Sequence, residues 1–190
     1  DRLDPIKKLI LVTMHRRENQ GSPMRAVFAA LREMVDQEPD IEVVYPVHLS
    51  PAVQEVAHDL LGNHERIHLI EPLDVFDFHN LASRSYFIMS DSGGVQEEAP
   101  SLGKPVLVLR DTTERPEGVR AGTLKLVGTD PETVKSTMSE LLNDEKLYFE
   151  MANARNPYGD GKASARIVQA IKHYFALGDA TEEFHEGDEN

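Results

Sequence analysis

The feature that most constrains the fold of this chain is an alternation of short β-branched runs with longer amphipathic stretches. The hydrophobic runs predict strands at 7–15, 41–48, 66–72, 86–91, 105–111 and 123–129. Stretches with helical periodicity occupy 23–37, 51–63, 74–85, 93–103, 131–144 and 162–178. Near-continuous hydrophobicity is typical of parallel strands that helices cover on both faces. The alternation therefore predicts an α/β fold, a Rossmann-like doubly wound parallel sheet.

The length of 190 residues suits one domain of this kind. We expect a single domain over residues 1–178, followed by a tail over residues 179–190. The tail holds six acidic residues and no basic one, so we expect it to be solvated and mobile. The first residue is Asp1 rather than Met, and we expect a fragment of a longer protein.

Composition excludes several classes of function. A formal net charge of -13 argues against a nucleic-acid partner, because phosphate neutralisation needs clustered Lys and Arg. No apolar run approaches the roughly 20 residues of a membrane helix, so we expect no membrane partner. Without cysteine there is no disulfide or thiolate metal site, and the histidines lack metal-ligand spacing, so no metal is expected. With no secretory signal, we expect a cytoplasmic protein.

Charged and hydrogen-bonding residues gather directly after the predicted strands. In open parallel sheets, ligands bind beyond the carboxyl ends of the strands, where the strand order reverses. The segments at those ends are HRRENQG (15–21), VHLSP (47–51), EPLDVFDFHN (71–80), SDSGGVQEE (90–98) and RDTTERPEG (110–118). We therefore expect the functional site at this edge of the sheet.

The SDSGG segment lies between a strand and a helix, which suits an anion. Helix N-termini present unpaired N–H groups and a partial positive charge, and glycines let a phosphate approach the backbone. Ser92 could cap the helix or donate to a phosphate. The alternative is a tight turn in which Gly93 and Gly94 serve packing alone and Ser92 is a plain cap. The dinucleotide pattern GxGxxG is absent after the first strand, so no nicotinamide or flavin cofactor is expected.

Two glutamates follow these glycines. A carboxylate aimed at a phosphate would be repelled, whereas one about a helical turn further could accept hydrogen bonds from ribose hydroxyls, as acidic residues do in other nucleotide folds. This favours Glu98 as a ribose ligand and Glu97 as a solvated or structural partner. The alternative is a pair of surface glutamates that favour the helix dipole.

Two further side chains are candidates. Arg115 suits bidentate contact with a diphosphate, unless it forms only a surface ion pair with Glu114 or Glu117. His15 follows the first strand and could bind phosphate or transfer a proton, although a lone histidine is often structural.

A family resemblance rests on HRREN, YPVHLSP, EPLDVFDFHNL, SDSGGVQEEAPSLGKPVLVLRDTTERPEG and NPYGDG. Together these segments resemble the C-terminal half of the non-hydrolysing UDP-N-acetylglucosamine 2-epimerases, from about residue 9 to about residue 175. The resemblance implies one lobe of a two-lobed GT-B architecture, the lobe that binds UDP. It also implies interconversion of UDP-N-acetylglucosamine and UDP-N-acetylmannosamine, for cell-surface polysaccharide synthesis. UDP is eliminated to leave a 2-acetamidoglucal and then added back, without a nicotinamide or metal cofactor.

The resemblance also implies roles for individual residues. His15 matches an active-site histidine near the diphosphate, and Phe78 matches a residue that holds uracil, largely through its backbone. Ser92, Gly93 and Gly94 match the family's phosphate-binding turn. Glu98 matches the glutamate that binds ribose, and Arg115 matches the arginine at the diphosphate. A regulatory site for UDP-N-acetylglucosamine would use Arg16 and His48. Gln20 departs from the family, since an apolar residue is expected there, and we place it beyond the ligand contacts.

The family's catalytic carboxylates belong to the N-terminal lobe, which this chain lacks. We therefore expect the isolated chain to bind UDP weakly and not to epimerise, and we expect the parent protein to dimerise largely through the other lobe. Two alternatives stay open. The chain could be the donor-binding half of a GT-B glycosyltransferase, although its paired HRREN and DTTERPEG segments speak against this, or a UDP-sugar sensor without catalysis.

Overall fold

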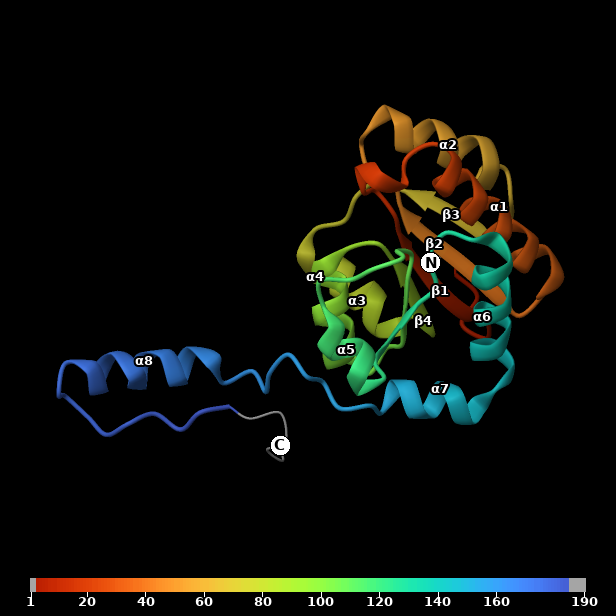
Figure 1. Cartoon of the computed structure of the whole chain (residues 1–190). Coiled ribbons are helices and arrows are strands. Elements are labelled where there is room, and N and C mark those ends of the chain that lie inside the picture. The colour runs from red at the N-terminus through yellow and green to blue at the C-terminus, as the bar shows by residue number, and fades with distance from the viewer. Residues whose placement is uncertain (1–2, 185–190) are drawn as a thin grey trace. The chain divides into compact units, whose positions relative to one another are not determined.

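The computed structural model describes residues 3–184 of the chain, which fall into two compact units divided between Arg155 and Asn156. The first unit contains one sheet of six parallel strands in the order β3-β2-β1-β4-β5-β6 (Figure 1). The strands are β1 Lys8–Thr13, β2 Ile41–Pro46, β3 Ile67–Ile70, β4 Phe87–Ser90, β5 Val106–Val108 and β6 Leu124–Leu126. The predicted Rossmann-like parallel sheet is confirmed.

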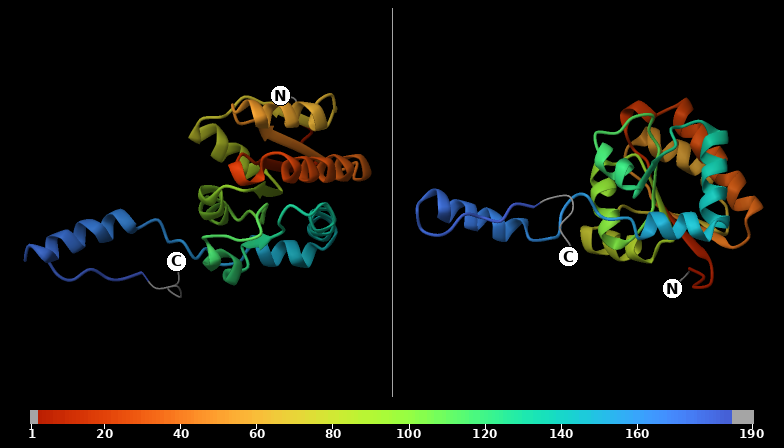
Figure 2. Two further views of the ribbon diagram at one scale, coloured as in Figure 1. Left: turned by 45° about the horizontal axis from the view of Figure 1, so that its top comes forward. Right: turned by 60° about the horizontal axis from the view of Figure 1, so that its bottom comes forward.

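Helices cover both faces of this sheet (Figure 2). The α-helices of the first unit are α1 Ser22–Gln37, α2 Pro51–Leu61, α3 Val75–Arg84, α4 Gly93–Glu98, α5 Pro116–Ala121, α6 Pro131–Asn143 and α7 Glu145–Ala152, and the 3₁₀ turns are η1 Arg17–Asn19 and η2 Ala99–Leu102. Side chains of α1, α2 and α6 build the core on one face, and those of α3 and α4 build the core on the other. On β1, Ile10 and Val12 face the first core and Leu11 the second, which explains the unbroken hydrophobic run.

Three helical segments differ from expectation. The predicted helix at 93–103 is divided, because α4 ends at Glu98 and the 3₁₀ turn η2 continues to Leu102. No helix was expected near 110–118, yet α5 begins at Pro116, a residue whose fixed φ suits the first helical position. Helix α7 was not expected; the Asp144 carboxylate caps it by accepting from the N–H groups of Lys146 and Leu147.

The strand order reverses between β1 and β4. From β1 the chain proceeds outward to β2 and β3, and from β4 it proceeds the other way to β5 and β6. The pair is in parallel register, with Ile10 opposite Phe87 and Thr13 opposite Ser90. The carboxyl ends of β1 and β4 therefore form the topological switch point at which such sheets bind ligands.

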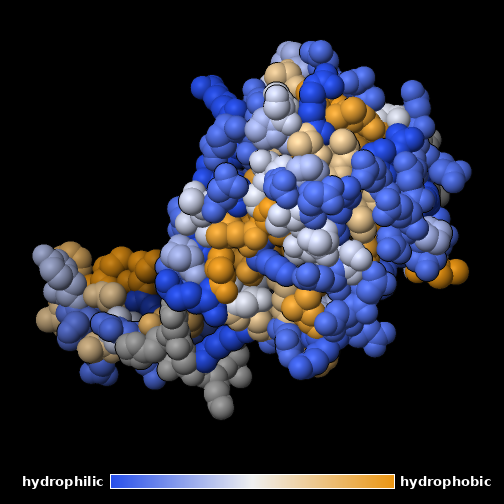
Figure 3. All heavy atoms as spheres, turned by 45° about the vertical axis from the view of Figure 1, so that its right-hand side comes forward, coloured by the Kyte–Doolittle hydropathy of each residue, from blue (hydrophilic) through white to orange (hydrophobic). Residues whose placement is uncertain are grey.

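The second unit contains α8, Ala163–Tyr174. The Asp160 carboxylate accepts two hydrogen bonds from the Arg166 guanidinium, at 2.7 and 2.8 Å, which lower the pKa of Asp160. Apolar side chains on and after α8 are exposed (Figure 3), namely Ile167, Val168, Ile171, Tyr174, Phe175 and Leu177. The expected domain limits, 1–178 and 179–190, stay predictions, and residues 185–190 lie outside the described part. Within residues 3–184, no helix is both long and apolar enough to cross a membrane.

Candidate functional site

The loops after β1, β4 and β5 meet at the switch point. The N–H of Asp91 donates to the Thr13 carbonyl at 3.2 Å, and the N–H of Leu109 donates to the Ser90 carbonyl at 2.9 Å. The buried hydroxyls of Thr13 and Ser90 are hydrogen-bonded at 2.7 Å. This network brings the HRREN, SDSGG and RDTTERPEG segments together, as expected from the strand-end rule.

A hollow of about 490 Å³ opens beside this junction, and we call it the polar hollow. The rings of His15 and His48 stack there with centroids 5.2 Å apart and an angle of 21° between their planes. The hollow thus joins two residues that the sequence assigned to different sites, one active and one regulatory. Gln20, expected to lie beyond the ligand contacts, also belongs to the lining, which is His15, Arg16, Arg17, Gln20, His48, Ser50 and Ser92.

Cationic side chains surround the Glu114 carboxylate next to this hollow. Arg16 Nη2 lies 3.1 Å from Glu114 Oε1, and Arg110 Nη1 donates to the other carboxylate oxygen. A hydrogen bond to its own backbone N–H, followed by those from Arg110, lowers the pKa of Glu114. A carboxylate thus occupies the position between these guanidinium groups.

Gly93 is the point on which these charges converge. A methyl group built on Gly93 would lie 3.0 Å from Glu114 Oε1, 3.6 Å from Arg16 Nη2 and 3.8 Å from Arg115 Nη2. A built methyl at Gly94 would meet only flexible atoms, at 3.8 Å or more. The absence of a side chain at Gly93 therefore lets the Glu114 carboxylate and the guanidinium groups of Arg16 and Arg115 lie close to the start of α4.

Arg115 is held by an ion pair that the sequence did not predict. Its Nε donates to a Glu97 carboxylate oxygen, and its Nη1 donates to the Glu114 carbonyl at 3.2 Å. Glu97 is thus an ion-pair partner of Arg115, whereas the alternative considered from the sequence was a pair with Glu114 or Glu117. With a side chain that is 43% exposed, Glu97 is both solvated and structural.

Phe78 on α3 and Glu98 on α4 line the same gap between these helices, which is too narrow to hold a water molecule. His79 Nε2 is 3.0 Å from Glu98 Oε2, which ties the two helices together, and the Glu98 side chain is half-exposed. Glu98 Oε1 lies 3.8 Å from a methyl group built on Gly94. The predicted uracil and ribose residues therefore adjoin the predicted phosphate turn.

Sequence reasoning missed the buried polar residues that hold these loops. Gln96 is fully buried; its amide donates to the Ser92 carbonyl at 3.2 Å and its Oε1 accepts from Thr113 Oγ1 at 2.5 Å. Ser92 occupies the N-cap position of α4, but within residues 3–184 its side chain makes no capping hydrogen bond. Gln96, rather than the Ser92 side chain, therefore links the first turn of α4 to the loop after β5. The sequence offered one sign of this role, since Gln96 falls on the inward face of a predicted helix.

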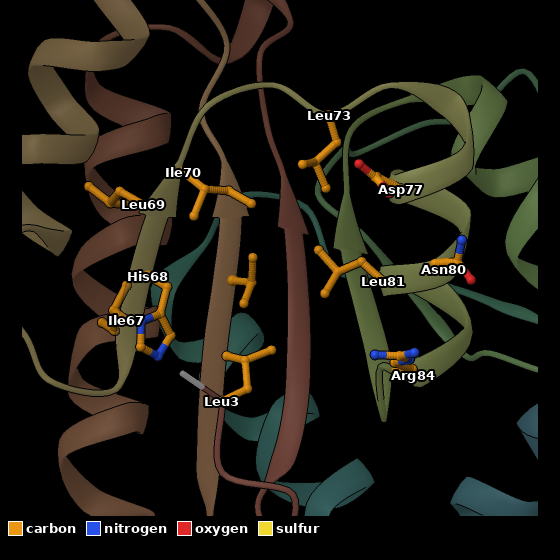
Figure 4. A pocket seen from close by; sticks show the side chains of 11 residues that line it. Leu3, Ile67, His68, Leu69, Ile70, Leu73, Asp77, Asn80, Leu81 and Arg84 are labelled. Carbon is orange, nitrogen blue, oxygen red and sulfur yellow. The ribbon is translucent and has the colours of Figure 1, made fainter. Parts of the chain in front are cut away.

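A larger hollow of about 970 Å³ lies on the β2–β3 flank of the sheet, and we call it the apolar hollow (Figure 4). Its lining is mostly aliphatic and comes from β2, β3, α3 and the loop between β3 and α3: Val44, Ile67, Leu69, Ile70, Leu73 and Leu81 among others. Its lining includes none of the predicted site residues. Within the described part of the chain, no group of three or more His, Asp or Glu side chains is placed to hold a metal ion.

Comparison with known proteins decides the family. The profile of the UDP-N-acetylglucosamine 2-epimerase family matches residues 2–172. A UDP-N-acetylglucosamine 2-epimerase of Bacillus subtilis is 61% identical over 168 residues, 88% of this chain and 44% of that protein. The chain belongs to the UDP-N-acetylglucosamine 2-epimerase family. It spans about half the length of the curated relatives that it matches.

Solved structures of epimerases share this fold. The Staphylococcus aureus protein MnaA in complex with UDP is 57% identical, with a TM-score of 0.92 over 95% of this chain and 50% of that one. The Neisseria meningitidis epimerase bound to UDP-GlcNAc is 47% identical, with a TM-score of 0.86 over 90% of this chain and 46% of that one. The C-terminal domain of a Francisella tularensis glycosyl transferase shares the fold alone, at 16% identity and a TM-score of 0.59 over 80% of this chain and 82% of that domain.

Proposed function

We propose that this chain is the UDP-binding half of an enzyme that interconverts UDP-N-acetylglucosamine and UDP-N-acetylmannosamine. The observation that carries the proposal is the convergence of Arg16 and Arg115 on Gly93, at the topological switch point. Within UDP, the diphosphate is the negatively charged group that pairs of arginine side chains bind through charge-assisted hydrogen bonds. Relatives solved with UDP and with UDP-GlcNAc support the choice of ligand.

The proposed pose runs from the switch point towards α3. The diphosphate lies against Ser92, Gly93 and Gly94 with Arg115 beside it. The ribose donates hydrogen bonds to Glu98, and uracil lies at Phe78. The short distance between Glu98 and Gly94 supports this order, because a ribose hydroxyl group and its phosphate are separated by only a few bonds.

The proposed reaction removes the C2 proton and eliminates UDP from C1, and it then adds UDP back at C1 while a proton returns to the opposite face of C2. Negative charge develops on the departing diphosphate oxygen, and fixed hydrogen-bond donors and cations aimed at that oxygen stabilise the transition state. His15 and Arg115 supply this stabilisation in the proposal. Removing one such group from an intact enzyme is expected to cost on the order of two to three powers of ten in rate.

The carboxylates that handle the C2 proton belong, in this proposal, to the half of the protein that the chain does not cover. The isolated chain then binds UDP without turnover, and the parent is a cytoplasmic homodimer that feeds cell-surface polysaccharide synthesis. A shared site with Arg16 and His48 also leaves room for regulation by UDP-N-acetylglucosamine. The stacking of His48 on His15 supports a direct link between the two sites.

Calorimetric titration of the chain with UDP, UMP and uridine tests the proposal. We expect UDP to bind at least tenfold more tightly than uridine, and Arg115→Ala to remove most of that preference. A matched control is Arg32→Ala, since Arg32 lies on α1 and pairs with Asp36 instead. Equal affinity for UDP and uridine in the unmodified chain would show that the diphosphate site is wrongly assigned.

A further inference from the structure

Asp91 is a buried acid whose contacts the proposed pose does not use. Its exposed fraction is 0%, and it follows the last residue of β4 at the switch point. A carboxyl group removed from water is costly unless hydrogen bonds replace its hydration. The residues that satisfy Asp91 therefore show what it holds in place.

The hydrogen-bond donors to Asp91 all come from the HRREN segment. The His15 N–H lies 3.2 Å from Oδ1 and 3.1 Å from Oδ2, and the Arg16 N–H donates to Oδ2 at 2.8 Å. The Asn19 side-chain amide donates to the same oxygen at 2.9 Å. Asp91 thus satisfies two consecutive backbone N–H groups and one side chain of the loop after β1.

The main chain of Asp91 strengthens the same connection. Its N–H donates to the Thr13 carbonyl at 3.2 Å, and its carbonyl accepts from Arg16 Nε at 3.1 Å. Asp91 therefore holds Arg16 at two places. Its carboxylate accepts from the Arg16 backbone N–H, and its carbonyl accepts from the Arg16 guanidinium. This arrangement directs Arg16 Nη2 towards Gly93.

Resting on the proposed function, we propose that Asp91 is the positioning residue of the diphosphate site, which it serves by fixing His15 and Arg16 without touching the ligand. The N–H groups of His15 and Arg16 are engaged by Asp91, so a diphosphate meets the side chains of these residues rather than their backbone. Hydrogen bonds to an ionised carboxylate are about twice as strong as neutral ones, which suits a rigid support.

An asparagine at position 91 keeps the shape but not the acceptor set. Its single oxygen could replace Oδ2, which now accepts from His15, Arg16 and Asn19, but without the negative charge, and its NH₂ group would then face the His15 N–H that lies 3.2 Å from Oδ1. In Asp91→Asn the loop after β1 is therefore held more weakly. The effect is expected on the diphosphate part of binding alone, because uracil and ribose are placed at Phe78 and Glu98.

The test compares the affinities for UDP and uridine, by NMR titration, of the unmodified chain, Asp91→Asn and the control Ser85→Ala. Ser85 is buried at the C-terminal end of α3, before β4 begins, and its hydroxyl donates to the Ala82 carbonyl. We expect Asp91→Asn to weaken UDP binding about tenfold, a typical cost of lost alignment, with uridine affinity unchanged within twofold. Ser85→Ala is expected to change neither.

The outcomes separate the two proposals. If the unmodified chain does not prefer UDP to uridine, the proposed function fails. If that preference exists and Asp91→Asn retains it, or if UDP and uridine weaken equally, the positioning role is wrong. If Asp91→Asn does not fold, Asn19→Ala is measured instead, because it removes one hydrogen-bond donor to Asp91. It is expected to weaken UDP binding about threefold and to leave uridine binding unchanged. An unchanged UDP affinity would then overturn the inference.

Discussion

The polar hollow and the apolar hollow differ in size, chemistry and position. The apolar hollow is about twice as large, at 970 Å³ against 490 Å³, and aliphatic side chains dominate its lining. The polar hollow is lined by histidines, arginines and serines and lies at the switch point of the strand order. Topology and charge, rather than volume, therefore mark the candidate site in this fold.

The two hollows also differ in the interactions that hold their side chains in place. Side chains of the polar hollow are held by long-range hydrogen bonds and ion pairs, as in Arg16 with Asp91 and Glu114. The aliphatic side chains of the apolar hollow have no such groups and depend on packing, although His68 in the same lining pairs with Glu42. Substitutions in the polar hollow should change UDP affinity and leave the free energy of unfolding nearly unchanged. Substitutions in the apolar hollow should lower the free energy of unfolding and leave UDP affinity nearly unchanged.

The largest effect on binding is expected from Arg115→Ala. Removal of a charged partner of the diphosphate costs about 2–3 kcal/mol, a loss of roughly 30- to 150-fold in UDP affinity. Arg84→Ala, in the lining of the apolar hollow, is the matched control and should leave the dissociation constant unchanged. Calorimetry measures both, and equal losses in the two variants would remove the distinction between the hollows.

The converse substitution is Val44→Ala, on the apolar side. Val44 is 3% exposed on β2, and deletion of its two methyl groups should lower the free energy of unfolding by about 2 kcal/mol. UDP affinity should not change under conditions where the variant is folded. Urea denaturation followed by circular dichroism measures the first quantity, and a stability loss below 0.5 kcal/mol, outside the order of magnitude expected for core truncation, would contradict the packing argument.

A smaller effect distinguishes the two glycines of the predicted phosphate turn. In Gly93→Ala the new methyl group fills the space between Arg16, Arg115 and Glu114, so UDP affinity should fall about tenfold, or about 1.4 kcal/mol. In Gly94→Ala the methyl group meets only ordinary contacts, and the change should stay below about threefold. A larger loss in Gly94→Ala than in Gly93→Ala would move the diphosphate away from the arginine cluster.

The smallest effect is expected from Glu114→Gln, and it has the opposite sign. The Glu114 carboxylate pairs with Arg16 and lies where a diphosphate would compete for that guanidinium. Neutralising it should tighten UDP binding about threefold, as for a partly exposed ion pair. The titration is run at pH 7.5, above the lowered pKa of Glu114, so that the wild-type side chain is charged. Weaker binding in the variant would mean that Glu114 orients Arg16 rather than competing for it.

Most of the fold could be predicted from the sequence because its signal is local. The inner strands β1, β4 and β5 are buried almost throughout and form hydrophobic runs, whereas the edge strands β3 and β6 are only partly buried. The start of α6 is also a local feature, since the Asp130 carboxylate accepts from the Thr133 N–H. The short helices α5 and α7 escaped prediction because six and eight residues give too little periodicity. Their start signals, Pro116 and Asp144, were nevertheless present.

The site could be predicted only in part. The strand-end rule brought His15, Ser92 and Arg115 to one edge of the sheet, since it depends on topology alone. The contacts of Asp91, Gln96 and Glu97 could not be read from the sequence, because they join loops that are far apart in the chain. A hydrogen bond between residues 75 positions apart, such as Arg16 to Asp91, leaves no local pattern.

The pairing of β1 with β4 has a consequence for how the protein folds. The hydroxyls of Thr13 and Ser90 are separated by 77 residues, so a long loop must close before these strands can pair, and that closure carries an entropic cost. The first three strands can associate earlier, since β1, β2 and β3 are consecutive neighbours. Non-local pairing of this kind slows folding. The ligand site therefore comes into existence only when the two halves of the sheet join, and UDP should slow hydrogen exchange across the whole junction rather than in one loop.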